Sequence, residues 1–220
     1  DIFRMERAHG LLRAIGEHAP TLRDPVNGHF GELFGAIQTS LTLDAVMAAA
    51  RLFDRPYKRY QTRCLRHVLE LIQTHKDDLL EIREPHQLRL SLQAAGLQAK
   101  LEHLVPEGGA AFAQGLADHF LGVLDSEAVA RELDLLKTLR DKALAHNEDV
   151  EPIAGPTWGA LTDLAGIAKR LVGLLGWAYL GTAYEIDGRY ELSDDAGRPA
   201  LAMVRLAEHL KTARIGAVRP

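Results

Sequence analysis

The segment from Leu136 to Asp149 brings together residue types that bind phosphate and transfer protons, in the order LKTLRDKALAHNED. Arginine holds a phosphate through charge-assisted hydrogen bonds. A histidine with an ordinary pKa of about 6.5 acts as a general acid or base near neutral pH. Arg140 and His146 are six residues apart, so an ideal helix places them roughly 120° apart around its axis. They act on one ligand only if the arginine reaches around the helix or if a second chain completes the site.

A solvated helix end has a similar composition, which gives this segment a second interpretation. Cations and histidines near a helix C-terminus interact favourably with the helix dipole. Lys142 and His146 are four residues apart and share one helix face in either case. The segment by itself therefore leaves a chemical role and a purely structural role open.

A second segment, from Arg51 to Arg66 (RLFDRPYKRYQTRCLR), is strongly basic, and we define these residues as the basic strip. Its cations are Arg51, Arg55, Lys58, Arg59, Arg63 and Arg66, with Tyr57 and Tyr60 between them. Such a combination is typical of single-stranded RNA binding, because cations neutralise phosphates and aromatic rings stack on bases for about 1–3 kcal/mol per base. The alternative is a solvated basic segment at the end of a helix.

The string from Arg140 to His146 (RDKALAH) resembles the signature of the HEPN superfamily, in which an arginine and a polar residue precede a histidine by a few positions. Five residues separate the arginine from the histidine here. Upstream, residues 34–54 end in Ala-Arg-Leu-Phe-Asp, which is similar to a helix of abortive-infection-type, AbiU-like HEPN proteins. The resemblance covers about residues 30–180 of the chain.

The resemblance implies a metal-independent endoribonuclease that needs no cofactor and acts as a toxin or phage-defence effector. His146 would be the general acid or base for attack of a ribose 2′-hydroxyl on the adjacent phosphate. Arg140 would bind that phosphate and stabilise its developing charge. Asp141 would orient the arginine or the histidine, and Lys142 and Asn147 are candidate auxiliary residues.

The expected partners are RNA, a second copy of the chain in a homodimer, and an antitoxin or other inhibitor protein. The superfamily also contains members without nuclease activity. The alternative function is therefore a catalytically silent HEPN-like module that binds RNA or protein, or a dimeric scaffold.

The spacing of apolar residues predicts an all-α protein, with an antiparallel helical bundle as its architecture. Apolar side chains recur at steps of three and four residues, as on one face of a helix, in segments near 30–53, 65–79, 88–101, 133–143 and 161–179. A last helix is expected at about 199–214. Residues 184–192 (YEIDGRYEL) alternate around Asp-Gly, which predicts a small β-hairpin. No long linker interrupts the sequence, so we expect a single helical domain over 1–220, with an HEPN-like core at about 30–180 and the hairpin and last helix at 184–214.

The composition excludes some classes of protein. The 220 residues include 26 Lys and Arg and 30 Asp and Glu, for a formal net charge of −4, which excludes a globally basic nucleic-acid binder. A local basic groove remains possible because charges act over a Debye length of roughly 8–10 Å. The apolar stretch from Leu171 to Tyr184 is too short to cross a bilayer and predicts a buried core helix. We expect a cytoplasmic protein without a membrane partner.

Metal and nucleotide sites have weak support. The one cysteine, Cys64, rules out a disulfide within the chain and a multi-cysteine zinc site. Cys64, His67 and His75 supply fewer ligands than a structural zinc site needs, so no metal is expected. The pair Gly108-Gly109 lacks the lysine and hydroxyl residue of a phosphate-binding loop, which disfavours nucleotide kinases.

Overall fold

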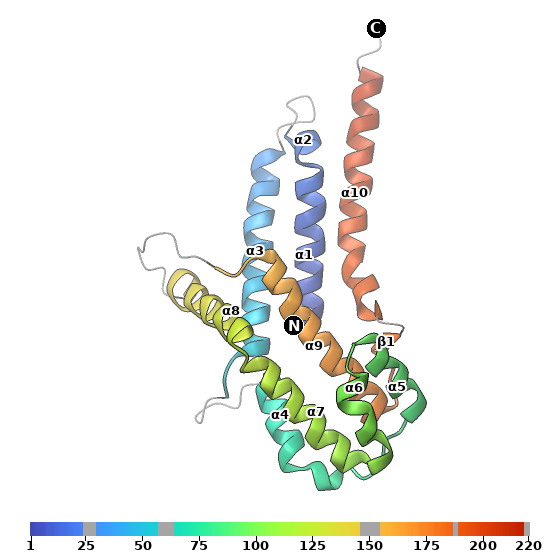
Figure 1. Ribbon diagram of the computed structural model, residues 1–220. Helices are drawn as coiled ribbons and strands as arrows, with labels where there is room; N and C mark the ends of the chain where they lie inside the picture. The colour runs from blue at the N-terminus through green and yellow to red at the C-terminus, as the bar shows by residue number, and fades with distance from the viewer. Residues whose placement is uncertain (24–29, 57–63, 146–154, 187–188, 218–220) are drawn as a thin grey trace. The chain divides into compact units, whose positions relative to one another are not determined.

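The computed structural model describes residues 1–23, 30–56, 64–145, 155–186 and 189–217, and helices dominate it (Figure 1). The predicted all-α class is confirmed. The chain divides into two compact units, each of which is described by itself. The terminal unit contains Phe3–Ala48 and the chain from Leu192 onward, and the central unit contains Ala49–Glu191. The expectation of a single domain stays a prediction.

The terminal unit is built from long helices whose apolar faces meet. It contains α1 (Ile2–Glu17), α2 (Ala19–Leu22), the first part of α3 (Gly31–Phe53) and α10 (Leu192–Ala217). In Figure 1, α1 and α3 run in opposite directions. The core of this unit consists of Ala14, Ile15, Leu22, Phe34, Met203 and Ala207.

The last helix, α10, begins seven residues before the expected start at Pro199, which lies inside the helix. Proline lacks a backbone N–H and is favoured in the first turn, which is why the sequence suggested a start there. Ala196 and Met203, seven residues apart on one helix face, are both buried. Their packing offsets the hydrogen bond that Pro199 cannot make.

The central unit packs shorter helices around a core of leucine and phenylalanine side chains. Its helices are α4 (Leu65–Thr74), α5 (Pro85–Ala94), α6 (Gln98–Leu101), α7 (Gly109–Leu124), α8 (Glu127–Thr138) and α9 (Trp158–Leu175). The fully buried side chains include Leu69, Leu88, Leu92, Phe112, Leu116, Leu171 and Leu174. The last two confirm that the apolar stretch from Leu171 onward contributes to the core.

Local turns divide two of the expected helices. The helix expected at 65–79 ends at Thr74 and is followed by a 3₁₀ turn at Lys76–Asp78. The helix expected at 88–101 is α5 and α6, separated at Gly96, whose φ of 69° is in the left-handed region. Glycine adopts that conformation without steric cost and commonly ends a helix.

The predicted hairpin is present as β1 (Glu185–Ile186) and β2 (Arg189–Tyr190), which pair antiparallel with Glu185 opposite Tyr190. The hairpin is attached to the π-helical segment Gly176–Leu180, which follows α9, because the indole N–H of Trp177 donates to the backbone oxygen of Glu185 at 3.0 Å. A two-stranded hairpin is marginal alone, and this contact anchors it to the central unit.

Among the described residues, α3 is the one helix long and apolar enough to cross a membrane by length and composition. The core helix of a soluble protein passes the same test. Of its apolar 18-residue window, 28% is buried. The cytoplasmic location stays a prediction.

Candidate functional site

The Arg140 side chain is positioned by the end of α8, where the helix widens into a π-helical segment at Leu139–Ala145. Short π-helical segments within helices often lie at functional sites. Leu136 is buried, and Arg140 follows it by four residues on the same helix face. The packing of α8 therefore turns Arg140 toward the protein, and only 20% of its side chain is exposed.

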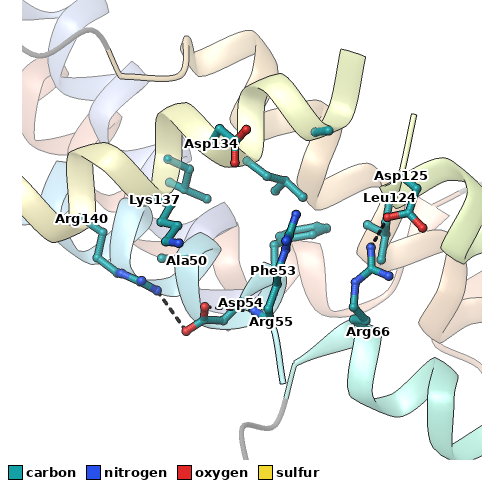
Figure 2. A pocket seen from close by; sticks show the side chains of 13 residues that line it. Ala50, Phe53, Asp54, Arg55, Arg66, Leu124, Asp125, Asp134, Lys137 and Arg140 are labelled. Carbon is teal, nitrogen blue, oxygen red and sulfur yellow. Dashed lines mark hydrogen bonds and ion pairs between the residues drawn. The ribbon is translucent and has the colours of Figure 1, made fainter. Parts of the chain in front are cut away.

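Two carboxylates hold the Arg140 guanidinium, and Figure 2 shows one of them, Asp54. Its Nε donates to Oδ1 of Asp141 at 2.7 Å, and its Nη1 donates to Oδ2 of Asp54 at 3.0 Å. Asp141 is the next residue in the chain, whereas Asp54 directly follows α3. The two segments that carried the sequence resemblance therefore meet in one ion-pair cluster.

The electrostatic surroundings keep Arg140 charged. The hydrogen bond from Arg140 to Asp141 is the main cause that raises the pKa of the guanidinium above its ordinary value. The negative charges of Asp54 and Asp141 act in the same direction, and burial opposes them. A permanently charged, oriented guanidinium suits the binding of a phosphate.

Arg140 borders a pocket of about 300 Å³. Its walls carry the cations Arg55, Arg66, Lys137 and Arg140, the carboxylates Asp54, Asp125 and Asp134, and the apolar residues Ala50, Phe53, Leu124, Ala130, Leu133 and Leu136. Four cations against three carboxylates leave a small positive excess. The pocket therefore offers both charged donors and apolar surface to a ligand.

The carboxylates also engage other residues of the pocket. A guanidinium N–H of Arg66 donates to Oδ1 of Asp125. The backbone N–H of Arg55 donates to Oδ1 of Asp54 at 3.0 Å. In Figure 2 the side chains of Lys137 and Arg140 extend from the same helical segment toward the end of α3.

The structure brings together part of the predicted site. Arg140 and Asp141 are in contact, and Arg55 and Arg66 of the basic strip line the same pocket as Arg140. Arg51 and Lys142 are exposed and do not line that pocket. The other predicted residues lie outside the described residues: His146, Asn147, Tyr57, Lys58, Arg59, Tyr60 and Arg63.

Sequence reasoning gave no role to four charged residues of the pocket, Asp54, Asp125, Asp134 and Lys137, and two of these, Asp54 and Lys137, lie beside Arg140. Asp54 closes the Ala-Arg-Leu-Phe-Asp string, and that position was its only signal. Lys137 precedes Arg140 by three residues, a spacing that places both on one helix face. Neither feature indicates by itself which side chain lies opposite.

A metal centre has no visible ligand set in the part of the chain that the structure describes. No group of three or more His, Cys, Asp or Glu residues there could hold a metal ion. Cys64 is buried at the start of α4.

Comparison with known protein families gives a match. The model of the HEPN family described as AbiU2 matches residues 25–200. No curated protein and no solved structure matches the chain. The match extends over most of the chain and includes both the end of α3 and the segment with Arg140, which confirms the resemblance expected from the sequence. The chain belongs to the AbiU2 family of HEPN domains.

Proposed function

We propose that the protein is a metal-independent endoribonuclease of the abortive-infection type. The observation that supports this most directly is Arg140, which two carboxylates orient beside a pocket with three further cations. An oriented guanidinium is suited to a phosphate that gains charge during a reaction. Membership of an HEPN family supports the same class of function.

The proposed reaction is a transesterification within the RNA strand. His146 takes the proton of a ribose 2′-hydroxyl, and the 2′-oxygen forms a bond to the adjacent phosphorus. The bond from phosphorus to the 5′-oxygen breaks, and that oxygen takes a proton from solvent. The products are a 2′,3′-cyclic phosphate and a 5′-hydroxyl. Arg140 stabilises the charge that develops on the phosphate oxygens.

The cations of the pocket extend the proposed site along the RNA backbone. Arg55, Arg66 and Lys137 line the pocket together with Arg140. Each phosphate that a cation neutralises releases counterions, so binding weakens as salt rises. The pocket carboxylates balance much of the positive charge, which favours moderate rather than tight RNA binding.

The test is cleavage of a single-stranded RNA by the full chain in the presence of a metal chelator. We expect the intact protein to cleave the RNA and to leave its all-2′-deoxy counterpart intact. His146→Ala should abolish cleavage, and a matched change of an exposed histidine outside the pocket, His103→Ala, should leave it unchanged. Cleavage that needs a metal ion, or equal cleavage by His146→Ala, would contradict the proposal.

The paired state of two pocket arginines favours a second candidate, a silent RNA-binding module. Arg66 and Arg140 already have carboxylate partners, so a phosphate must compete with them. This candidate predicts retention of RNA without cleavage. Lys137→Ala should then weaken binding and lower the salt slope by about one, whereas Lys100→Ala, outside the pocket, should change neither.

A further inference from the structure

Asp54 is held in place by the main chain and holds Arg140 in turn. Its Oδ1 accepts the backbone N–H of Arg55 at 3.0 Å, and its Oδ2 accepts Nη1 of Arg140 at 3.0 Å. The hydrogen bond to a backbone N–H restricts the Asp54 side chain to fewer rotamers than a surface aspartate samples. The guanidinium is thereby fixed relative to the end of α3 (Figure 2).

The two bonds to Arg140 leave the donors that a phosphate needs. A guanidinium has five N–H donors in one plane, and the bonds to Asp141 and Asp54 use one on Nε and one on Nη1. Both N–H groups of Nη2 and the second of Nη1 lie outside these bonds. The two carboxylates therefore fix the plane of the guanidinium without using all of its N–H donors.

We propose that Asp54 is a positioning residue, which orients the Arg140 guanidinium for the scissile phosphate. This inference rests on the proposed ribonuclease activity. Asp141 alone fixes one edge of the guanidinium from the neighbouring position in the chain, and the arginine could still rotate about that bond. Asp54 supplies a second point of attachment for the guanidinium, from the end of α3.

The position of Asp54 distinguishes it from a carboxylate that only joins two helices. About a third of its side chain is exposed (36%), and it lines the pocket that Arg140 borders. The ion pair therefore lies where a ligand can reach it. A purely structural pair with this exposure would contribute little to stability, since solvent screens partly exposed ion pairs.

The first test is a double-mutant cycle on RNA cleavage by the full chain. Asp54→Asn keeps the shape of the side chain and removes its charge. We expect it to lower kcat/KM roughly 10- to 100-fold, mainly through kcat, because a misplaced catalytic group has effects of that order. In the Arg140→Ala background the same change should have almost no effect, since Asp54 acts through Arg140. Asp54→Glu, which keeps the carboxylate, should recover part of the loss.

A matched control breaks an ion pair outside the pocket. Asp195→Asn removes the partner of Arg198 on α10, a pair of 2.7 Å, and should leave cleavage unchanged. Equal losses from Asp54→Asn in both backgrounds would show a structural role and overturn the proposal. Full activity of Asp54→Asn would overturn it as well.

A chemical test separates this inference from the proposed function. An arginine-selective dicarbonyl reagent followed by mass spectrometry reports how tightly each guanidinium is held. Asp54→Asn should raise the rate of modification at Arg140 several-fold without changing that at Arg66, and Asp125→Asn should do the reverse. If the intact protein cleaves no RNA, the proposed function fails, and this measurement still decides whether Asp54 holds Arg140. An unchanged rate at Arg140 would overturn the inference, and a melting curve of each variant confirms that it is folded.

Discussion

Arg140 has two carboxylate partners before any substrate arrives. Its ion pairs with Asp54 and Asp141 give the three residues a combined charge of −1. A phosphate entering the pocket therefore meets the negative charge of these carboxylates as well as the guanidinium. Lys137, on the same helix face as Arg140, adds a positive charge nearby. The balance of these charges, and not the arginine alone, determines how strongly the site attracts a phosphate group.

A second residue with an unusual environment is Glu185 in the hairpin. The residue is only 6% exposed and packs against Gly173 of α9. Burial raises the pKa of its carboxyl above the ordinary value of 4.5, and the charge of Arg170 partly opposes this. The folded state therefore favours the protonated form more than the unfolded state does. The stability that Glu185 contributes is complete below the unfolded pKa and is lost as pH rises through the folded pKa.

Glu185→Gln should remove this pH-dependent loss. We expect the variant to gain stability relative to the intact protein as pH increases from about 4 to about 8, because the neutral amide has no charge to bury. Urea unfolding at both ends of this range measures the difference. The exposed neighbour Glu191 provides the control, since Glu191→Gln should show no such trend. A difference that shrinks with rising pH would contradict the assignment.

At the scale of elements, α7 shows how local packing fixes a helix start. Gly109 begins α7, and a Cβ there would collide with the carbonyl oxygen of Leu79 and lie 2.9 Å from the backbone nitrogen of Glu81. The hydroxyl of Tyr179 also donates to the carbonyl of Gly109 at 2.8 Å. The close approach of these backbone segments requires glycine, and backbone atoms cannot move away as a flexible side chain would.

Gly109→Ala and Gly122→Ala should change stability in opposite directions. Gly109→Ala should lower the free energy of unfolding by about 1–3 kcal/mol, the usual effect of overpacking. Gly122 lies in the same helix, and a Cβ at that position would meet no neighbouring heavy atom within 4 Å. Gly122→Ala should therefore stabilise the protein by about 0.4–1 kcal/mol, because alanine has less freedom to lose on folding. Thermal melts of the two variants test this, and a stabilised Gly109→Ala would contradict the packing.

The π-helical segment at Leu139–Ala145 is the element that carries the candidate site. Apolar spacing predicted a helix there but gave no sign of its wider hydrogen bonding. Such a segment shifts the positions that follow it around the helix axis. Arg140, at its start, keeps the face set by Leu133 and Leu136 of α8, which line the same pocket.

At the scale of the whole molecule, a homodimer with composite sites is a proposal that mixing can test. The idea comes from the sequence alone: on an ideal α-helix, Arg140 and His146 would lie roughly 120° apart, and a second chain could then supply one of the two residues. Arg140→Ala and His146→Ala should each be inactive alone. Mixed and allowed to exchange subunits, they should recover about a quarter of the intact activity, since half the symmetric dimers are then hybrids with one complete site of two.

The mass of the particle in solution provides a second test of the homodimer. Light scattering should give about twice the chain mass of 24.2 kDa for the dimer that a two-fold interface forms. No recovery on mixing, together with subunit exchange demonstrated by a tagged chain, would place both residues in one chain. A monomeric protein that still cleaves RNA would contradict the composite site directly.

The sequence by itself determined the helical elements and the local half of the site. Apolar spacing of three and four residues is a property of neighbouring positions, so most helices could be predicted, although α7 was not. The hairpin around Asp187-Gly188 and the contact between Arg140 and Asp141 are equally local. The two segments of the HEPN resemblance were also visible as strings of residues, and the family match confirms them.

Only the tertiary structure decided how these parts meet. Asp54 and Arg140 are 86 residues apart, and no local pattern states which carboxylate an arginine contacts. The packing of α8 near the end of α3 brings Asp54 against Arg140. The same packing brings Arg55, Arg66 and Lys137 to one pocket. Local spacing determines which face of a helix is apolar. The pairing of distant polar groups depends on how those faces pack against each other. That packing is a property of the folded chain and cannot be deduced from local spacing in the sequence.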